Sequence, residues 1–210
     1  MNNSSIKISV VVTNFNYGKY ITRCLRSLIN QEIDKNMYEI IVVDDNSSDD
    51  SLEKISSYVK RNEIVLIKNK KNLGIGGASR IGVDNSRGKY FVRVDSDDFV
   101  QPAFLYILYN FLKFNPTYIG VSSDYYITDN NEKIISRKKF SNQTIACGLM
   151  LRTSYLEQIG SYNKDKKIFE DTDLFNRLNK KIIFNLPIPL YNYVKHKKSA
   201  TSKFIKNDSN

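Results

Sequence analysis

The sequence has few residues of the kinds that build disulfide scaffolds or zinc sites. Its 210 residues include two cysteines, Cys24 and Cys147, a single histidine, His196, and no tryptophan. The two cysteines lie far apart and lack the spacing of metal ligands, which argues against both a disulfide framework and a zinc site. We expect two small, buried, reduced thiols in a cytosolic protein.

Long apolar segments are also missing. No apolar run approaches the roughly 20 residues that would span a bilayer, and the apolar stretch of residues 6–12 is too short and badly flanked for a signal peptide. There is no solenoid-type repeat and no low-complexity tract. A chain of this length suits one domain with a substantial core, and we expect a soluble cytoplasmic protein.

Acidic residues are fewer than basic residues. The chain has 32 Lys and Arg residues against 22 Asp and Glu, a formal net charge of +10. This excess favours anionic partners such as phosphates, nucleic acid or an acidic membrane surface, without choosing among them. With 41% hydrophobic and 26% charged residues the composition is that of a globular domain, so wholesale disorder is excluded.

The hydrophobic pattern predicts alternating strands and helices in the first half of the chain. Strands are expected at residues 6–13, 38–43, 64–68 and 90–94, and helices at 20–31, after residue 51, after the glycines near residue 76, and at 101–114. The second half is less regular, with strands at 118–128, 133–139, 145–152 and 182–193 and helices at 154–159 and near 170. The pattern indicates an α/β fold whose parallel sheet is extended by antiparallel strands.

Acidic residues gather where the fourth predicted strand ends. Asp95, Asp97 and Asp98 follow that strand, and ligands of open α/β sheets bind outside the carboxyl ends of strands. Asp95 and Asp97 are two residues apart, so on an extended backbone both can address one ion. Their hard oxygen ligands suit Mg²⁺ or Mn²⁺. Taken alone, this stretch is equally consistent with an Asp/Ser turn that caps the next helix.

Other polar groups allow two interpretations each. Asp45 follows the second strand, where a carboxylate could accept hydrogen bonds from a base or ribose, while the polar residues after it could cap the next helix. The glycines near residue 76 could approach a phosphate, but their spacing matches neither the dinucleotide fingerprint nor a Walker loop. Glu170 and Asp171 begin a predicted helix, where acids complement the helix dipole. A lone histidine such as His196 is more often structural or solvent-facing than a ligand.

Five blocks of sequence, in order, resemble the family 2 glycosyltransferases, which have the GT-A fold. They are residues 9–31, 38–51 (YEIIVVDDNSSDDS), 72–102 (ending VRVDSDDFVQP), 160–178 (with FEDTDLFNRL) and 193–202 (YVKHKKSATS). Each block is moderately specific, and together they cover nearly the whole chain. The resemblance implies one GT-A domain over residues 1–210, with a nucleotide-binding half (1–117), an acceptor-binding half (118–198) and a basic flexible tail (199–210).

The resemblance also implies a nucleotide-sugar site. Thr13 and Phe15 match positions that contact the base, and Asp45 matches the acid that reads uracil. Phe15 stands where the family usually has tyrosine, so stacking is kept and a hydroxyl contact is lost. Arg80 matches a cation near the diphosphate, although Ile81 replaces the asparagine common beside it.

Metal and catalytic residues follow from the same resemblance. Asp95 and Asp97 form its DxD motif, with Asp97 as the direct metal ligand and Asp95 nearer the ribose and the metal waters. His196 matches a further metal ligand, and Asp171 matches the catalytic base. Glu170 could raise the pKa of Asp171 by like charge or simply cap the helix.

The expected activity is an inverting transfer, dependent on Mn²⁺ or Mg²⁺, of a sugar from a nucleotide-sugar donor, with UDP as the expected nucleotide. The acceptor would be a hydroxyl of a glycan or lipid-linked molecule in cell-surface polysaccharide synthesis, and the basic excess suggests peripheral association with the inner face of an anionic membrane.

Two other classes of function have less support in the sequence. A sugar nucleotidyltransferase would need a glycine-rich basic signature after the first strand, of which NFNYGKY is a poor version. A nucleic-acid-binding protein is disfavoured because no known binding module is visible and the lysines are scattered.

Overall fold

The computed structural model describes residues 6–140, 147–167, 169–178, 182–196 and 199. The strands are β1 (Ile8–Asn14), β2 (Tyr38–Asp44), β3 (Val65–Lys68), β4 (Tyr90–Asp95), β5 (Phe99–Val100), β6 (Gly120–Thr128), β7 (Ile134–Lys138), β8 (Met150–Arg152) and β9 (Ile183–Val194). The helices are α1 (Gly18–Ile29), α2 (Ser51–Lys60), α3 (Gly74–Asp84), α4 (Phe104–Phe114), α5 (Thr153–Gln158) and α6 (Glu170–Arg177), with a 3₁₀ turn, η1, at Lys35–Met37. The residues expected to form a basic tail lie outside this description from residue 200 onward.

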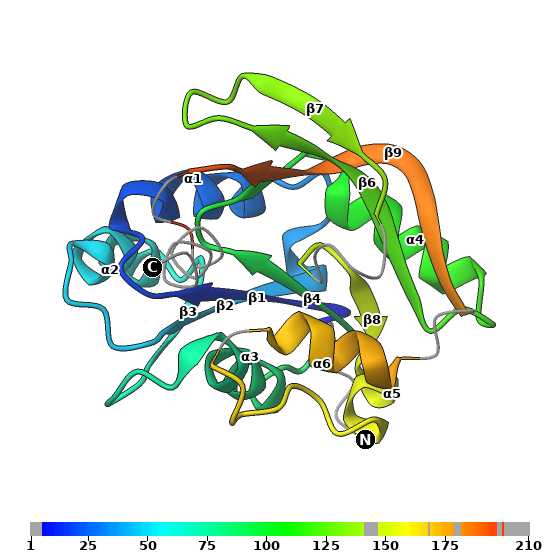
Figure 1. Ribbon diagram of the computed structural model, residues 1–210, viewed down its shortest axis with the longest axis horizontal. Helices are drawn as coiled ribbons and strands as arrows, with labels where there is room; N and C mark the ends of the chain where they lie inside the picture. The colour runs from blue at the N-terminus through cyan, green and yellow to red at the C-terminus, as the bar shows by residue number, and fades with distance from the viewer. Residues whose placement is uncertain (1–5, 141–146, 168, 179–181, 197–198, 200–210) are drawn as a thin grey trace, which may run out of the picture.

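The described strands form one mixed sheet in the order β3-β2-β1-β4-β8-β6-β9-β5, with β7 paired to β6 (Figure 1). Strands β3, β2, β1 and β4 are parallel, whereas β8 runs antiparallel to both β4 and β6. The predicted α/β fold, a mostly parallel sheet with an antiparallel extension, is confirmed. Within that extension the long pairing of β9 with β6 is parallel.

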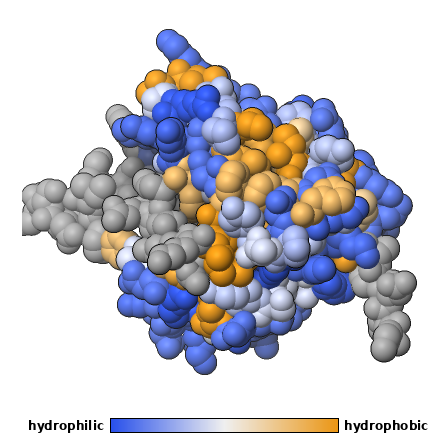
Figure 2. Space-filling model, turned by 90° about the vertical axis from the view of Figure 1, so that its right-hand side faces the viewer, coloured by the Kyte–Doolittle hydropathy of each residue, from blue (hydrophilic) through white to orange (hydrophobic). Residues whose placement is uncertain are grey.

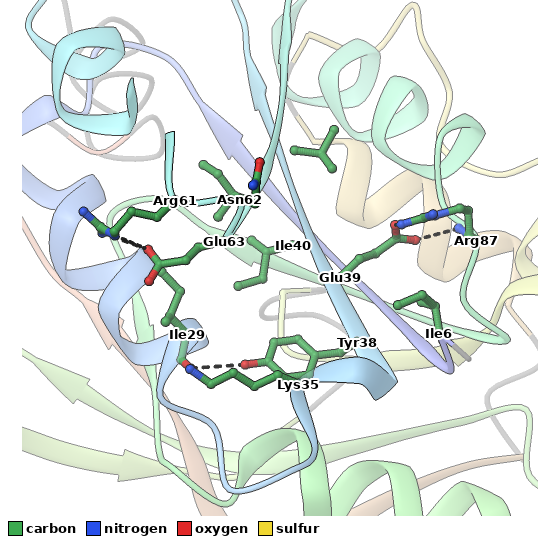
Figure 3. Close-up of a pocket in the computed structure, with 12 residues that line it drawn as sticks. Ile6, Ile29, Lys35, Tyr38, Glu39, Ile40, Arg61, Asn62, Glu63 and Arg87 are labelled. Carbon is green, nitrogen blue, oxygen red and sulfur yellow. Dashed lines mark hydrogen bonds and ion pairs between the residues drawn. The ribbon is translucent and has the colours of Figure 1, made fainter. Parts of the chain in front are cut away.

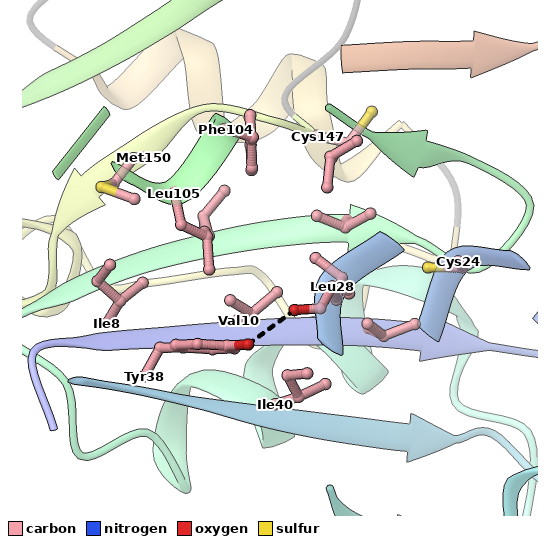
Figure 4. Close-up of a cluster of buried hydrophobic side chains, with 14 of the residues drawn as sticks. Ile8, Val10, Cys24, Leu28, Tyr38, Ile40, Phe104, Leu105, Cys147 and Met150 are labelled. Carbon is pink, nitrogen blue, oxygen red and sulfur yellow. Dashed lines mark hydrogen bonds between the residues drawn. The ribbon is translucent and has the colours of Figure 1, made fainter. Parts of the chain in front are cut away.

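Helices cover both faces of the sheet. Helices α1, α2 and α4 lie on one face and α3, α5 and α6 on the other (Figure 1). Because side chains alternate along a strand, Val10 of β1 faces the first set of helices and Val11 faces the second. Figure 4 shows the first core, which includes Val10 of β1, Leu28 of α1 and Phe104 of α4. This two-sided burial explains why these strands read as continuous apolar runs.

Helix α3 lies unusually close to the sheet. A Cβ atom added to Gly82 would come within 2.3 Å of a methyl carbon of Val11 in β1, so glycine is required for this approach. The close packing brings the start of α3 beside the carboxyl ends of the parallel strands, where Asp45 lies.

The second half contains the elements that sequence periodicity placed least well. The two-residue strand β5 was not expected, and α4 begins at Phe104, three residues later than predicted. Strand β8 is observed at Met150–Arg152, and the part of its predicted span before residue 147 lies outside the described residues. Strand β9 shifts register against β6 next to Pro189, because proline has no N–H to donate to the ladder.

Cys24 and Cys147 are both buried free thiols. In the part of the chain that the structure covers, no helix combines the length and apolar character needed to cross a membrane. Figure 2 views the side on which α4, β6 and β9 lie, and apolar residues gather near its centre. The exposed apolar side chains of these elements include Phe114 of α4 and Ile188 of β9.

Candidate functional site

The predicted site residues of the first half, apart from Arg80, lie at the carboxyl ends of parallel strands. Thr13 of β1 lies in register with Asp95 of β4, and the next residue, Asn14, lies in register with Asp44 of β2. Phe15 follows directly and is 44% exposed, whereas Thr13 is buried. The topology therefore brings the ends of β1, β2 and β4 to the one edge where open α/β sheets bind ligands.

The acidic stretch forms a tight turn anchored by its third aspartate. The backbone N–H of Asp98 donates to the carbonyl of Asp95 at 3.0 Å. The buried Asp98 carboxylate accepts hydrogen bonds from the Tyr191 hydroxyl at 2.7 Å and from the Val194 N–H at 2.8 Å. Burial, with Asp97 and Asp95 nearby, raises the pKa of Asp98 well above its usual range. Asp98 thus ties β9 to the turn, a role that the sequence did not reveal.

Asp97 and His196 meet, although 99 residues separate them in the chain. Nε2 of His196 lies 2.8 Å from Oδ2 of Asp97, and both residues are buried. The Tyr20 ring stacks on the imidazole with centroids 4.5 Å apart, and Arg23 donates to the Asp97 carbonyl at 3.0 Å. Helix α1 and the chain after β9 therefore fix this pair from two sides.

Asp95 has a buried carboxylate oxygen, Oδ1, to which no hydrogen bond is made among the described residues. The nearest cation to it is Arg93, whose Nε lies 3.0 Å away as an ion pair. Burial raises the pKa of Asp95 to about 6, Asp97 and Asp171 add to the rise, and Arg93 opposes it. A bound cation would satisfy this oxygen and lower the pKa of the carboxyl group, because a nearby positive charge favours the ionised form.

The donor set suits a divalent ion. Two carboxylates and an imidazole are ligands that Mn²⁺ accepts, and Mg²⁺ accepts the carboxylates. The 2.8 Å between Nε2 of His196 and Oδ2 of Asp97 is close to the separation of about 3 Å between neighbouring ligands of an octahedral ion with bonds of about 2.1 Å. The residues present therefore fit the predicted metal.

Among the described residues, the three whose possible ligand atoms all lie within 4.8 Å of one another are Asp95, Asp98 and Cys147, a group that includes neither Asp97 nor His196. It suits a hard cation less well, because burial raises the pKa of the Cys147 thiol well above its usual range and Asp98 is already held by Tyr191 and Val194. A protonated thiol is a poor ligand for Mn²⁺ or Mg²⁺.

Arg93 of β4 is the functional candidate that the sequence analysis missed. Its guanidinium is 1% exposed and contacts three carboxylates, those of Asp95, Glu170 and Asp171, at 2.8 to 3.0 Å. We call these four residues the Arg93 cluster. The available signal was a charged residue inside the otherwise apolar strand YFVRVD. A buried Arg with no partner would be very costly, so the acids of α6 and β4 account for its presence.

Glu170 and Asp171 open helix α6, and the backbone of the preceding Phe169 is left-handed, with φ of 59°. Burial raises the pKa of Glu170 to about 8; neighbouring Asp171 adds to the rise and Arg93 opposes it. Burial therefore favours the protonated form of Glu170, and the contact with Arg93 favours the charged form. The Asp171 side chain is 25% exposed, so it lies within reach of a molecule at the surface of the site.

Asp45 is occupied by hydrogen bonds from its own chain. Its carboxylate accepts from the backbone N–H of Leu73 and of Gly74, at 2.8 to 3.0 Å, and from the Asn69 side chain at 2.7 Å. Asp45 therefore caps the start of α3 through space. These contacts are those of a helix cap, a role that the position of Asp45 in the sequence did not indicate.

Arg80 lies on the exposed side of α3. It pairs with Asp84 at 2.8 Å and donates to the Gly160 carbonyl at 3.1 Å. It lines a hollow of about 560 Å³ together with residues 159–165, Asp173 and Arg177. The structure thus places Arg80 with the loop before α6 and gives it no contact with Asp95 or Asp97 among the described residues.

A second hollow, of about 500 Å³, lies at the opposite end of the strands (Figure 3). Four of its charged residues form two ion pairs: Arg61 contacts Glu63, and Arg87 contacts the buried Glu39 of β2. It is therefore separate from the predicted site and presents mostly neutralised groups.

Comparisons with known proteins identify the family and the fold. A glycosyltransferase of Haemophilus influenzae whose function is uncharacterized is 33% identical over 184 residues, which are 86% of this chain and 49% of that protein. The poly(ribitol-phosphate) beta-glucosyltransferase of Bacillus spizizenii is 42% identical over 112 residues, 52% of this chain and 18% of that protein. The chain thus spans less than half of the length of these relatives.

Solved structures share the fold. TarS 1–349 of S. aureus in complex with UDP-GlcNAc superposes with a TM-score of 0.80 at 23% identity, covering 94% of this chain and 61% of that one. The mannosyltransferase of Pyrobaculum calidifontis in complex with GDP-Man and Mn²⁺ gives a TM-score of 0.74 at 16% identity, covering 96% and 60%. These likenesses establish the GT-A fold. Residues 9–183 match the family model described as glycosyl transferase family 2, and the chain therefore belongs to that family.

Proposed function

We propose that this protein transfers a sugar from a UDP-sugar to an acceptor hydroxyl, with inversion and with the help of Mn²⁺ or Mg²⁺. The observation that carries the proposal is the Arg93 cluster, in which Asp95 and Asp171 contact the same guanidinium. A sugar transferase must hold the leaving diphosphate and the acceptor base within one site. An acid from each half of the chain meets that requirement here.

The proposed donor is a UDP-sugar. Support comes from the solved neighbour that binds UDP-GlcNAc, together with the exposed Phe15 ring at the end of β1, which is available to stack on a base. Thr13 would lie beneath the same base. Asp45 would support this wall by holding the start of α3, as its hydrogen bonds to Leu73 and Gly74 indicate.

Asp97 and His196, with Asp95, would hold the divalent ion, and the Mn²⁺ complex of the mannosyltransferase neighbour supports that choice of metal. When bound, such an ion neutralises charge that develops on a departing nucleoside diphosphate. Tyr20 keeps the His196 ring in place by stacking, and Arg23 keeps Asp97 in place through its carbonyl. Arg80 is a further candidate contact for the diphosphate. Its ion pair with Asp84 would have to break before its side chain could reach a phosphate.

Asp171 is the proposed general base. An acceptor hydroxyl is a poor nucleophile at neutral pH, so a carboxylate within hydrogen-bond reach must accept its proton as the sugar–phosphate bond breaks. With one base and no enzyme nucleophile, attack occurs in line and the anomeric configuration inverts. The Arg93 guanidinium, 3.0 Å from its carboxylate, would hold Asp171 in place.

The proposed acceptor is a glycan or lipid-linked hydroxyl in synthesis of a cell-wall or other surface polymer. The named relative that acts on poly(ribitol-phosphate) supports a polymer acceptor. The net charge of +10 suits such anionic polymers and equally an anionic membrane, so the charge alone selects neither.

Two substitutions test the assignment of roles. Asp171→Asn should lower kcat about 10³-fold, within the range for loss of a general base, and leave the Kd for UDP with Mn²⁺ within threefold of wild type. Asp97→Ala should lose the Mn²⁺-dependent part of UDP affinity as well as transfer. Transfer is measured with radiolabelled UDP-sugars and binding by calorimetry.

The matched control is Asp173→Asn, two residues further along α6, where the side chain pairs with Arg177. It should transfer sugar at close to the wild-type rate. Wild-type turnover by Asp171→Asn would remove the base assignment, and Mn²⁺-independent UDP binding by the wild type would remove the metal assignment.

A further inference from the structure

We propose that Arg93 is a positioning residue that fixes Asp171 of α6 against Asp95 of β4, and so sets the distance between the acceptor base and the metal-binding turn. This inference rests on the proposed function and deepens it.

Two of the three Arg93 nitrogens donate hydrogen bonds to acids, whereas Nε makes an ion-pair contact without a hydrogen bond among the described residues. Nε lies 3.0 Å from Asp95, Nη1 donates to Glu170 at 2.8 Å, and Nη2 donates to Asp171 at 3.0 Å. Nη1 also lies 3.3 Å from the Ser79 hydroxyl of α3. The Tyr162 ring, 5.4 Å from the guanidinium carbon, covers one face. Because the guanidinium is planar and contacts Asp95, Glu170 and Asp171, its orientation is fixed. The fixed guanidinium in turn fixes the positions of these carboxyl groups.

The choice of partners separates Arg93 from an arginine that only supports the fold. Arg152 of β8 donates to backbone carbonyls, those of Tyr118 at 2.9 Å and Leu112 at 2.8 Å. The charged contacts of Arg93 are instead the carboxylates of the predicted site. They come from the end of a strand and the start of a helix, elements that are far apart in sequence.

Residue chemistry predicts a graded response to substitution. Lysine keeps the charge but is a point donor, so it can hold one carboxylate well and the other poorly. Methionine keeps much of the volume and loses every ionic contact. Both changes should loosen Asp171 more than the turn, because the turn is also held by its own backbone bond and by Tyr191 and Val194.

The experiment compares Arg93→Lys, Arg93→Met and the control Arg152→Lys. We expect kcat to fall at least 100-fold for Arg93→Met and about tenfold for Arg93→Lys, while the Kd for UDP with Mn²⁺ and the KM for acceptor stay within threefold. Arg152→Lys should keep kcat within threefold. If Arg93→Met does not fold, Arg93→Lys decides. A kcat within threefold of wild type in a folded Arg93 variant, or losses of kcat and UDP affinity of equal size, would overturn the proposal.

A second readout needs no turnover and therefore separates this inference from the proposed function. Urea unfolding midpoints are measured for Arg93→Met, Asp171→Ala and the double variant. If Arg93 holds Asp171, the midpoint shift caused by Asp171→Ala in the Arg93→Met background should be less than half of its shift in the wild type. Equal shifts would contradict the linkage, whatever the protein transfers.

Discussion

At the scale of single residues, the buried charges of this protein have two different explanations. Glu39 of β2 and Arg93 of β4 both interrupt apolar strands, and both are buried. Glu39 lies at the amino end of the sheet and is satisfied by Ser9 and Arg87. Arg93 lies near the carboxyl end and joins acids of the candidate site. A sequence shows that a strand carries a charge, but position along the strand decides whether that charge faces a ligand.

Asp98 likewise has a role that depends on its surroundings in the fold. The sequence predicted that three aspartates would follow β4 and could address one ion. The structure gives the third to Tyr191 and Val194 instead. Tyr191 belongs to a strand almost a hundred residues away, so no local pattern could have identified this partner.

Glu170 provides a prediction at the residue scale. Its pKa is raised to about 8 in the folded protein, mainly by burial, whereas an unfolded glutamate titrates near 4.3. Between these values the folded state holds a proton that the unfolded state has released, so stability falls as pH rises. Relative to Glu170→Gln, the wild type should lose about 1 kcal/mol of unfolding free energy per pH unit between about pH 5 and 8.

Urea denaturation at intervals of half a pH unit measures this difference. Subtracting the two profiles removes the contribution of the other titrating groups that both proteins share. Parallel profiles over the whole interval would show that Glu170 is ionised in the folded protein at neutral pH.

At the scale of elements, the start of helix α3 depends on an acid from another strand. The helix has no side-chain cap of its own, and its first N–H groups donate to Asp45, which follows β2. The residues after Asp45 were expected to cap the next helix along the chain, whereas Asp45 itself was expected to contact the nucleotide. Capping across space could not be predicted, because it depends on how closely α3 approaches the sheet at Gly82.

Removal of this cap should therefore destabilise the protein. Asp45→Ala leaves the N–H groups of Leu73 and Gly74 and the Asn69 amide without their acceptor, at an expected cost of about 2–4 kcal/mol. Asp84→Ala, at the other end of α3, breaks only an exposed pair with Arg80 and should cost less than about 1 kcal/mol. Chemical denaturation of both variants makes the comparison, and equal losses would show that Asp45 does not hold the helix.

Strand β9 marks the limit of prediction for elements. Its extended character was expected, but its parallel pairing with β6 and its contacts with β5 were not. Period-two alternation reveals a strand and says nothing about its neighbour. Pro187 and Pro189 further obscure the pattern, and the register shift lies at the same place.

At the scale of the whole molecule, a sheet covered by helices on both faces could be predicted from the sequence. The functional site could be predicted only in part. Continuous apolar strands alternating with amphipathic helices required a parallel sheet covered on both faces. Parallel strands then required one edge at which Thr13, Asp44 and Asp95 meet. The contribution of α6 and of the chain after β9 could be anticipated only by resemblance to a family, because no local signal places them at that edge.

Because the candidate site draws on β1, β4 and the chain beyond β9, a ligand that fills it should stabilise the molecule as a whole. A ligand at 100 times its Kd adds about 2.7 kcal/mol, and for a chain of 210 residues this corresponds to a rise in Tm of about 5–10 °C. We expect UDP with Mn²⁺ to give that rise, each component alone to give much less, and ADP with Mn²⁺ to resemble Mn²⁺ alone. The joint effect should vanish in Asp97→Ala, since that carboxylate is in contact with His196 at the centre of the donor set. A panel of thermal unfolding curves checks all of these expectations together. Equal rises with UDP and ADP would exclude base recognition at the end of β1, and an equal rise with UDP in the presence of a chelator would exclude a metal shared between nucleotide and turn.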